Sequence, residues 1–190
     1  MRFEPLALPG VLLVHADPVG DARGAFARLH CEREFGQQGL PGRMVQTSLS
    51  STRERGTVRG MHFQWPPSRE GKLVRCVGGA IHDVVIDLRP DSPTFRHHLS
   101  VELAPEPLSA VFIPPGFAHG FQTLADDVQV LYQMTDFYDP QRAAGVRWND
   151  PAFGIVWPLP LTAIHERDAA YPDFDAARFA AELQSRGGGF

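Results

Sequence analysis

The stretch VRGMHFQWPPSREGKLVRC at residues 58–76 gathers a histidine and several cations on segments with the pattern of strand, turn and strand. Arg59, His62, Lys72 and Arg75 all fall within it, although the net charge of the chain is −4. An imidazole can act as a base near neutral pH, and guanidinium and ammonium groups bind anions. Two arrangements fit this pattern. The strands could form a barrel whose interior is a reaction chamber for an anionic ligand, or they could turn these side chains to solvent.

The run KLVRCVGGAIHDVVIDLRP contains two β-branched segments around Gly78 and Gly79, which predicts a hairpin with a two-residue turn of positive φ. In that hairpin residue 77 would oppose 80, 74 would oppose 83 and 72 would oppose 85. Alternation then predicts one shared face, made of Lys72, Val74, Cys76, Ile81, Asp83 and Val85. Asp83 would lie diagonal to Lys72 and keep a buried lysine charged. The alternative is an exposed ion pair across two strands, which contributes little to stability.

The segment IPPGFAHGF at residues 113–121 contains Pro-x-Gly-x-x-His, a turn that ends one strand and directs His119 into the next. It resembles the second sequence motif of cupins, which are double-stranded β-helix barrels. In metal-binding cupins the first motif supplies His-x-His and a Glu, and the matching place here is MHFQ, with Gln64 where the second His would stand. His62, His119 and Glu70 remain as candidate ligands. They are a poor set for a divalent transition metal, so we expect no metal.

Length and composition predict an ordinary globular chain. At 190 residues we expect a single domain spanning 1–190. The mildly acidic balance argues against nucleic acid as the main partner. No apolar run approaches the ~18 residues of a membrane span and no signal-peptide pattern is present, so we expect a cytoplasmic protein without a membrane partner. Cys31 and Cys76 follow no metal-type spacing and are expected to be reduced thiols.

Short strands separated by turns account for most of the chain. The strand candidates are GVLLVH, MVQTSLSS, TVRGMHFQW, HHLSVELAP, SAVFIPP, HGFQTLA and DVQVLYQMTDFY. After the first of them we expect a turn around Asp17–Asp21 and then an extended or short helical piece. Only PDFDAARFAAELQSR has helical signals, with Asp173 or Asp175 as the cap and apolar residues at Ala177, Phe179, Ala180 and Leu183. Turns about every 8–12 residues indicate an all-β sandwich, jelly roll or barrel.

Six segments taken together resemble the dTDP-4-dehydrorhamnose 3,5-epimerase family, nucleotide-sugar epimerases of the cupin fold. They are RGTVRGMHFQWPPSREGKLVRC, DVVIDLRPDSPTF, IPPGFAHGFQTL, LYQMTDFYDP, GVRWNDPAFGIVWP and ERDAAYP. The resemblance runs from about Asp21 to Pro172 and keeps the motifs in the family's order. It implies a double-stranded β-helix, a cupin or jelly-roll barrel, with the short C-terminal helix packed outside.

The family's reaction inverts carbons that flank the C4 ketone of a nucleotide-linked 4-keto-6-deoxy sugar, at C3, at C5 or at both. It needs a base for the α-proton, an electrophile for the enolate oxygen and an acid on the opposite ring face, and it needs no cofactor. The resemblance assigns His62 as the base, Lys72 as the holder of the enolate oxygen and Tyr132 as the acid. Asp168 resembles the carboxylate that orients the imidazole. Without the resemblance, Asp168 would read as a surface acid and Tyr132 as a core aromatic.

The resemblance also implies how a nucleotide-diphosphate sugar is held. Arg59 and Arg23 match the diphosphate contacts, where a planar guanidinium binds oxygens bidentately. Tyr138 matches an aromatic residue that stacks on the base. The remaining expected substrate contacts are Gln46, Ser48, Asp83, His119 and Arg167. The family is dimeric, commonly with strands exchanged between subunits, so Arg23 is expected to serve the neighbour's site in a homodimer.

Three positions depart from the family pattern around the nucleotide. Arg28 stands where the family usually has a Glu, Ala143 stands where an acidic residue is common, and Ser48 stands where an Asn often follows the Gln. Exchanging an acceptor for a cation changes which base edge or phosphate is preferred. We therefore hypothesise a different nucleotide sugar, such as a CDP-linked one, or a branch-specific dTDP sugar.

Two other classes of function compete with the epimerase. A metal-dependent cupin oxygenase or isomerase would use His62, Glu70 and His119. A non-catalytic module that binds nucleotide sugars would bind without exchanging protons, but a pure binder has no need for a base and an acid on opposite faces.

Overall fold

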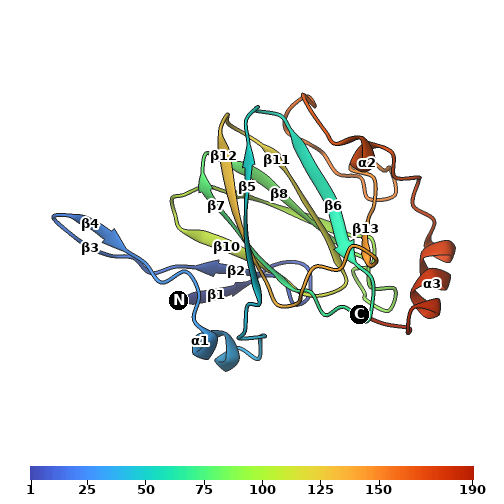
Figure 1. Cartoon of the computed structure of the whole chain (residues 1–190), viewed down its shortest axis with the longest axis horizontal. Coiled ribbons are helices and arrows are strands. Elements are labelled where there is room, and N and C mark those ends of the chain that lie inside the picture. Colours follow the sequence, from blue (N-terminus) through green and yellow to red (C-terminus); the bar gives the residue numbers. More distant parts are fainter.

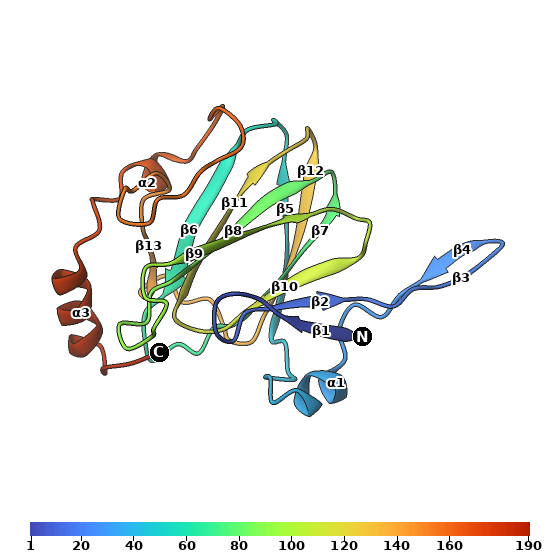
Figure 2. The same ribbon diagram turned by 180° about the vertical axis from the view of Figure 1, so that it is seen from behind.

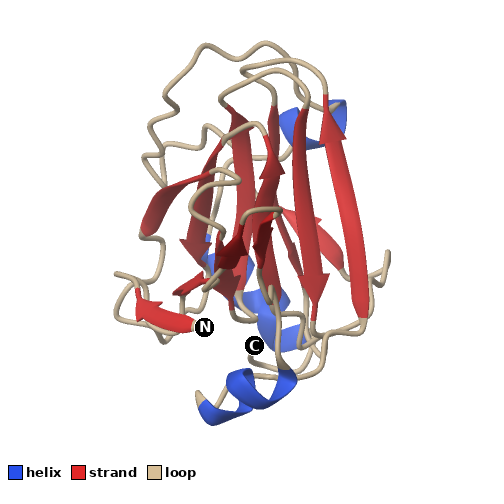
Figure 3. Cartoon of the chain, turned by 90° about the vertical axis from the view of Figure 1, so that its left-hand side faces the viewer, coloured by secondary structure: helices blue, strands red, loops and turns tan.

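Two antiparallel sheets face each other in the computed structural model, which describes all residues 1–190 (Figures 1 and 2). One sheet has six strands in the order β1 (Arg2–Pro5), β2 (Leu12–His15), β10 (Ser109–Ile113), β7 (Lys72–Gly78), β12 (Val128–Met134) and β5 (Gln46–Thr52). The other has five strands in the order β13 (Ala143–Gly145), β6 (Val58–Gln64), β11 (Phe117–Thr123), β8 (Ile81–Asp87) and β9 (His98–Leu103). Strands make up the body and helices lie at its periphery (Figure 3). This arrangement confirms the predicted all-β jelly-roll barrel.

The core lies between the two sheets. Val74, Cys76, Ile81 and Val85 all belong to one buried cluster there, which confirms the inward face predicted from alternation. At about 25 cal/mol per Å² of buried apolar surface, such a cluster is the main source of stability.

The predicted hairpin between residues 72–78 and 81–87 is wrong. β7 pairs with β10 and β12, whereas β8 pairs with β9 and β11, so the two strands lie in opposite sheets. The chain crosses from sheet to sheet at Gly78–Ala80, where Gly79 has a φ of 73°. A glycine turn reverses the chain but does not specify whether the next strand lies alongside or opposite. The alternation of inward and outward side chains continues from β7 into β8. The predicted inward-facing residues therefore do face the core, although β7 and β8 do not pair with each other.

The predicted contact between Lys72 and Asp83 is wrong for the same reason. Lys72 forms its ion pair with Glu70. Oδ1 of Asp83 lies 2.7 Å from Nε2 of His119 on the neighbouring strand β11. Strands in facing sheets are farther apart than hydrogen-bonded neighbours. Asp83 therefore pairs with the next strand of its own sheet, and Lys72 pairs with Glu70 just before β7.

Residues 16–29 form an arm that projects from the body (Figures 1 and 2). Its hairpin consists of β3 (Val19–Asp21) and β4 (Gly24–Phe26). The turn predicted at Asp17–Asp21 therefore lies after β3, and the piece that follows is a strand. Val19 is 76% exposed and Phe26 is 80% exposed, so large apolar side chains of the arm have no cover within this chain.

The longer helices cover the outer faces of the sheets. α1 (Glu32–Gln37) places Phe35 against Val14, Leu73 and Phe112 on the six-stranded sheet. α3 (Ala176–Ser185) begins at Asp175, whose carboxylate accepts the N–H of Arg178 at 2.9 Å, as predicted for its cap.

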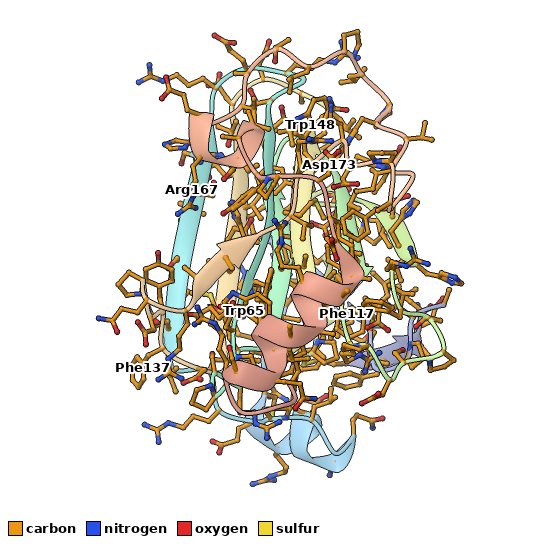
Figure 4. All side chains as sticks on the ribbon, turned by 90° about the vertical axis from the view of Figure 1, so that its right-hand side faces the viewer. Trp65, Phe117, Phe137, Trp148, Arg167 and Asp173 are labelled. Atoms are coloured by element: carbon orange, nitrogen blue, oxygen red, sulfur yellow. The ribbon has the colours of Figure 1, made fainter.

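The C-terminal helix packs where the sequence predicted it. α3 buries Phe179 and Leu183 in a cluster on the outer side of the five-stranded sheet, and Trp65 lies beside it (Figure 4). No helix in the chain combines the length and the apolar character needed to cross a membrane.

Candidate active site

A cavity of about 590 Å³ opens between the two sheets beside α2 (Glu166–Ala169). Seven of the predicted site residues line it: Arg59, His62, Lys72, His119, Tyr132, Arg167 and Asp168. Arg59, His62 and His119 lie on β6 and β11 of the five-stranded sheet. Lys72 and Tyr132 lie on β7 and β12 of the six-stranded sheet. Arg167 projects from α2 next to β6 (Figure 4). The cations and the histidine of the 58–76 stretch are therefore placed as a barrel lumen would place them, with the exception of Arg75, which points to the other side of β7.

His62 and Asp168 form a hydrogen-bonded pair at one wall of the cavity. Nε2 of His62 lies 2.7 Å from Oδ1 of Asp168, and the imidazole is 37% exposed while the carboxylate is 5% exposed. The second carboxylate oxygen accepts the backbone N–H of Gly60 at 3.3 Å. Burial alone would raise the pKa of Asp168, but the hydrogen bond and charge of His62, with Gly60 and Arg167, hold that pKa below its usual value. Asp168 is thus a carboxylate that fixes the imidazole.

The segment before α2 is hydrogen-bonded to β6. These contacts bring Asp168 close to His62, which lies on β6 more than a hundred residues earlier in the chain. The N–H of Val58 donates to the carbonyl of Ala163 at 2.9 Å, and Val58 and Ile164 form an isolated parallel bridge. His165 then caps α2, since its Nδ1 accepts the N–H of Arg167 at 3.1 Å. These contacts place Asp168 over His62.

Tyr132 and Lys72 come from the opposite sheet, on β12 and β7. Burial raises the pKa of the Tyr132 phenol well above its usual value, the charge of Asp83 raises it further, and Arg59 offsets only part of this. Tyr132 is therefore a protonated phenol at neutral pH. Lys72 is mostly buried and carries Glu70 as its counter-ion.

His119 and Asp83 form a second buried pair behind Tyr132. Nε2 of His119 lies 2.7 Å from Oδ1 of Asp83, and both side chains are almost fully buried. The imidazole packs edge-on against the Tyr132 ring, with the two centroids 5.8 Å apart. His119 reaches the cavity, whereas Asp83 lies behind it and does not line the cavity.

Arg59 is one of the cations that line the cavity. Its Nε donates to Oγ1 of Thr52 at 2.8 Å and its Nη2 donates to the carbonyl of Ser51 at 3.2 Å, which anchors the guanidinium to β5. The sequence did not predict three polar residues that also line the cavity, namely Ser50, Thr57 and His165. Ser50 could have been found, because it lies two positions after Ser48 and so shares its face of β5.

Besides Asp83, four predicted contacts do not line the cavity: Arg23, Gln46, Ser48 and Tyr138. Ser48 lies on the edge strand β5, opposite Tyr132 in register. The side-chain carbonyl of Gln46 accepts the backbone N–H of Tyr138, whose ring is 54% exposed, so these two form a shelf at the sheet edge. Arg23 is at the tip of the arm, 90% exposed and paired with Asp21.

Each of the three side chains weighed as metal ligands is paired with a partner of its own. His62 pairs with Asp168, His119 with Asp83 and Glu70 with Lys72. No group of three or more His, Cys, Asp or Glu side chains is gathered where it could hold a metal ion. The donor arrangement therefore does not favour the metal-dependent cupin alternative.

The positions that depart from the family pattern are accounted for in part. Arg28 forms an ion pair with Glu34, Nη1 to Oε1 at 2.9 Å, at the base of the arm. Ala143 begins β13 and pairs with Gln64 on β6.

A family model for dTDP-4-dehydrorhamnose 3,5-epimerase matches residues 5–176. The chain belongs to the dTDP-4-dehydrorhamnose 3,5-epimerase family. It is therefore an isomerase, as the resemblance implied. A dTDP-4-dehydrorhamnose 3,5-epimerase of Sinorhizobium fredii is 40% identical over 173 residues, which cover 90% of this chain and 89% of the relative.

Solved structures of the family share the fold. The Bacillus anthracis epimerase, solved with TDP and PPi bound, has a TM-score of 0.88 and 33% identity, with coverage of 91% of this chain and 99% of that one. A 3'-monoepimerase from Streptomyces bikiniensis, in complex with dTDP-quinovose, has a TM-score of 0.85 and 31% identity, with coverage of 95% and 90%.

Proposed function

We propose that this chain epimerises a nucleotide-diphosphate-linked 4-keto-6-deoxy sugar in the cavity between the sheets. The observation that carries the proposal is the opposition of two proton-transfer groups. The His62–Asp168 pair lines one wall, and Tyr132 with Lys72 lines the other, within a space of about 590 Å³. Family membership and the nucleotide-bound relatives support this class of substrate.

The chemistry follows from the hydrogen bond at His62. Nε2 donates its proton to Asp168, so Nδ1 keeps a lone pair that can remove the proton α to the C4 ketone. The electron pair of the broken C–H bond moves onto the ketone oxygen, where the ammonium of Lys72 stabilises the enolate. Asp168 stabilises the imidazolium that forms.

Tyr132 completes the inversion from the other face of the ring. Its phenol donates a proton to the same carbon as the enolate collapses to the ketone, which inverts the centre. The raised pKa keeps the phenol protonated until that step, and proton exchange with water returns both groups to their starting states. Whether C3, C5 or both are inverted depends on how the ring sits against Tyr132.

We assign nucleotide recognition to two cations of the cavity and to the exposed residues at the edge of β5. Arg59 and Arg167 at the mouth would bind the diphosphate, and Tyr138 with Gln46 and Ser48 would contact the base. Titration with dTDP, CDP and GDP tests which base is preferred. Much tighter binding of dTDP would falsify the altered-base hypothesis, and Arg28, already paired with Glu34, weakens that hypothesis.

We further propose that the working form is a homodimer in which the arm of each subunit enters the partner's cavity. Arg23 is 90% exposed and lies at the end of a projecting arm, away from its own cavity (Figures 1 and 2). The uncovered Val19 and Phe26 supply apolar surface for that contact.

The test is product analysis after incubation with dTDP-4-keto-6-deoxyglucose, by proton NMR of the sugar. We expect inverted configuration at C3, C5 or both. Unchanged substrate with folded protein and tight binding of the nucleotide sugar would instead indicate a binding module.

A further inference from the structure

The orientation of the arm relative to the body is not fixed by contacts within the arm itself. β3 and β4 pair only with each other, and every residue from Asp17 to Phe26 is exposed. A two-stranded hairpin without further packing has little stability of its own. Its orientation relative to the body must therefore be fixed where residues 16–29 join the body.

One buried arginine binds the exit of the arm directly and shares a backbone acceptor with its entry. The N–H of Ala16, at the entry, donates to the carbonyl of Leu108 at 3.1 Å. Nη1 of Arg75 donates to that same carbonyl, and Nη2 of Arg75 donates to the carbonyl of Leu29, at the exit, at 3.1 Å. A single guanidinium thus joins the exit of the arm to the carbonyl that also holds its entry.

Arg75 is itself held rigidly. It lies on β7, between β10 and β12 in the middle of the six-stranded sheet, and is 1% exposed. Its side-chain hydrogen bonds go to backbone carbonyls and not to a carboxylate, and its Nε has no hydrogen-bond partner. Burial lowers the pKa of Arg75 to about 10, so the group is still a cation at neutral pH.

A buried cation without a counter-ion is unfavourable, and an apolar side chain of similar size would fill the space without that cost. What an apolar side chain lacks is the planar fork that reaches two carbonyls at once. The ion pairs nearby do not replace it, because each has a mostly exposed member and surface pairs contribute little. Asp17, which pairs with the N-terminal amine, is 69% exposed, and Arg28, which pairs with Glu34, is 64% exposed.

We propose that Arg75 is a positioning residue that sets the direction of the arm and so delivers Arg23 to the partner's cavity. This inference rests on the arm exchange proposed above. β7 then serves both sites, since Lys72 enters its own cavity from one face of the strand while Arg75 fixes the arm from the other.

The test compares Arg75→Met and Arg75→Lys with Arg23→Ala in steady-state kinetics. Met removes both donors at similar length, and Lys keeps the charge but lacks the fork. We expect Arg75→Met to raise KM about tenfold with kcat changed less than about threefold, as Arg23→Ala does, and Arg75→Lys to fall between. The double variant should be no worse than Arg23→Ala alone, because Arg75 acts through Arg23.

Leu73→Ala is the matched control, because Leu73 is buried on the same face of β7 and removes packing without touching the arm. It should lower the melting temperature and leave KM unchanged. A readout independent of turnover is tryptic cleavage after Arg23 and Arg28 in the folded dimer, which should accelerate at least about fivefold in Arg75→Met.

The outcomes separate the two proposals. If Arg23→Ala raises KM but folded Arg75→Met keeps the wild-type KM and cleavage rate, the role of Arg75 is overturned and the proposed function stands. If Arg23→Ala leaves KM unchanged, the arm exchange fails and takes this inference with it.

Discussion

At the scale of single residues, the account depends on side chains that are far apart in sequence. His62 and Asp168 are 106 positions apart and share one hydrogen bond of 2.7 Å. Tyr132 and Lys72 meet them from the other sheet. Residue types at these positions could be assigned from the family resemblance, whereas Thr57 could not, because a small polar side chain leaves no distinctive pattern.

Asp168→Asn should reduce kcat by about 10²–10⁴-fold with little change in KM, because an amide cannot stabilise the imidazolium of His62. The lowered pKa of Asp168 also has a consequence for stability. The carboxylate stabilises the fold above its unfolded pKa and loses this effect as pH falls through its lower folded pKa. Melting temperature against pH should therefore fall less steeply on acidification in the variant.

Asp91→Asn, at an exposed position, is the control for that acid dependence. An Asp168→Asn enzyme with wild-type kcat would show that the carboxylate does not support the base.

The phenol of Tyr132 should remain protonated well past the ordinary tyrosine pKa of about 10. We expect ultraviolet titration curves of wild type and Tyr132→Phe to coincide up to the pH at which the fold is lost, while epimerisation is lost in the variant. The raised pKa means that Tyr132 favours folding below that ordinary value and destabilises the fold as pH rises above it. Loss of one titrating phenol near pH 10 in Tyr132→Phe would contradict this placement.

At the scale of elements, the sequence predicted faces better than it predicted neighbours. A period of two identifies which side chains share a face, and Val74, Cys76, Ile81 and Val85 do share the core. The same period does not show whether two strands are neighbours in one sheet or lie in two facing sheets. For this reason β7 and β8 were wrongly predicted to pair. The helix α3 was predictable down to its cap at Asp175, because its signals are local.

The crossing between the sheets should tolerate substitution at one glycine and not at the next. A Cβ at Gly79 would lie 2.8 Å from Cγ2 of Val128 at a φ of 73°, whereas one at Gly78 would meet Gln129 at 3.4 Å. Gly79→Ala should therefore cost about 1–3 kcal/mol and Gly78→Ala under about 1 kcal/mol, by denaturant unfolding. Equal effects of the two would contradict the crossing geometry.

At the scale of the whole molecule, the arm is the part that a single chain leaves unexplained. Its apolar residues Val19 and Phe26 are exposed to solvent, and the Arg23 guanidinium is paired with Asp21 alone. The resemblance predicted an exchanged element, but no local pattern in residues 16–29 predicts a hairpin that extends from the body. Its extension depends on contacts such as those of Arg75, which join distant segments.

Mixed dimers test the exchange. A dimer of Arg23→Ala and His62→Ala subunits has one site with both an intact His62 and an intact partner arm. Random mixing should restore about a quarter of wild-type activity at low substrate, since half the dimers are mixed and each has one complete site of two. No recovery above the average of the two parent variants would show that each arm serves its own subunit.

The most direct test of the account is hydrogen exchange at the sugar. Wild-type protein and His62→Ala would be incubated with dTDP-4-keto-6-deoxyglucose in heavy water and followed by proton NMR. We predict deuterium at C3, C5 or both with wild type, and none above the uncatalysed background with folded His62→Ala, because the variant lacks the imidazole that we propose takes the α-proton. Exchange by His62→Ala at the wild-type rate would contradict the assignment of the base, and its absence from wild type would contradict the epimerase itself.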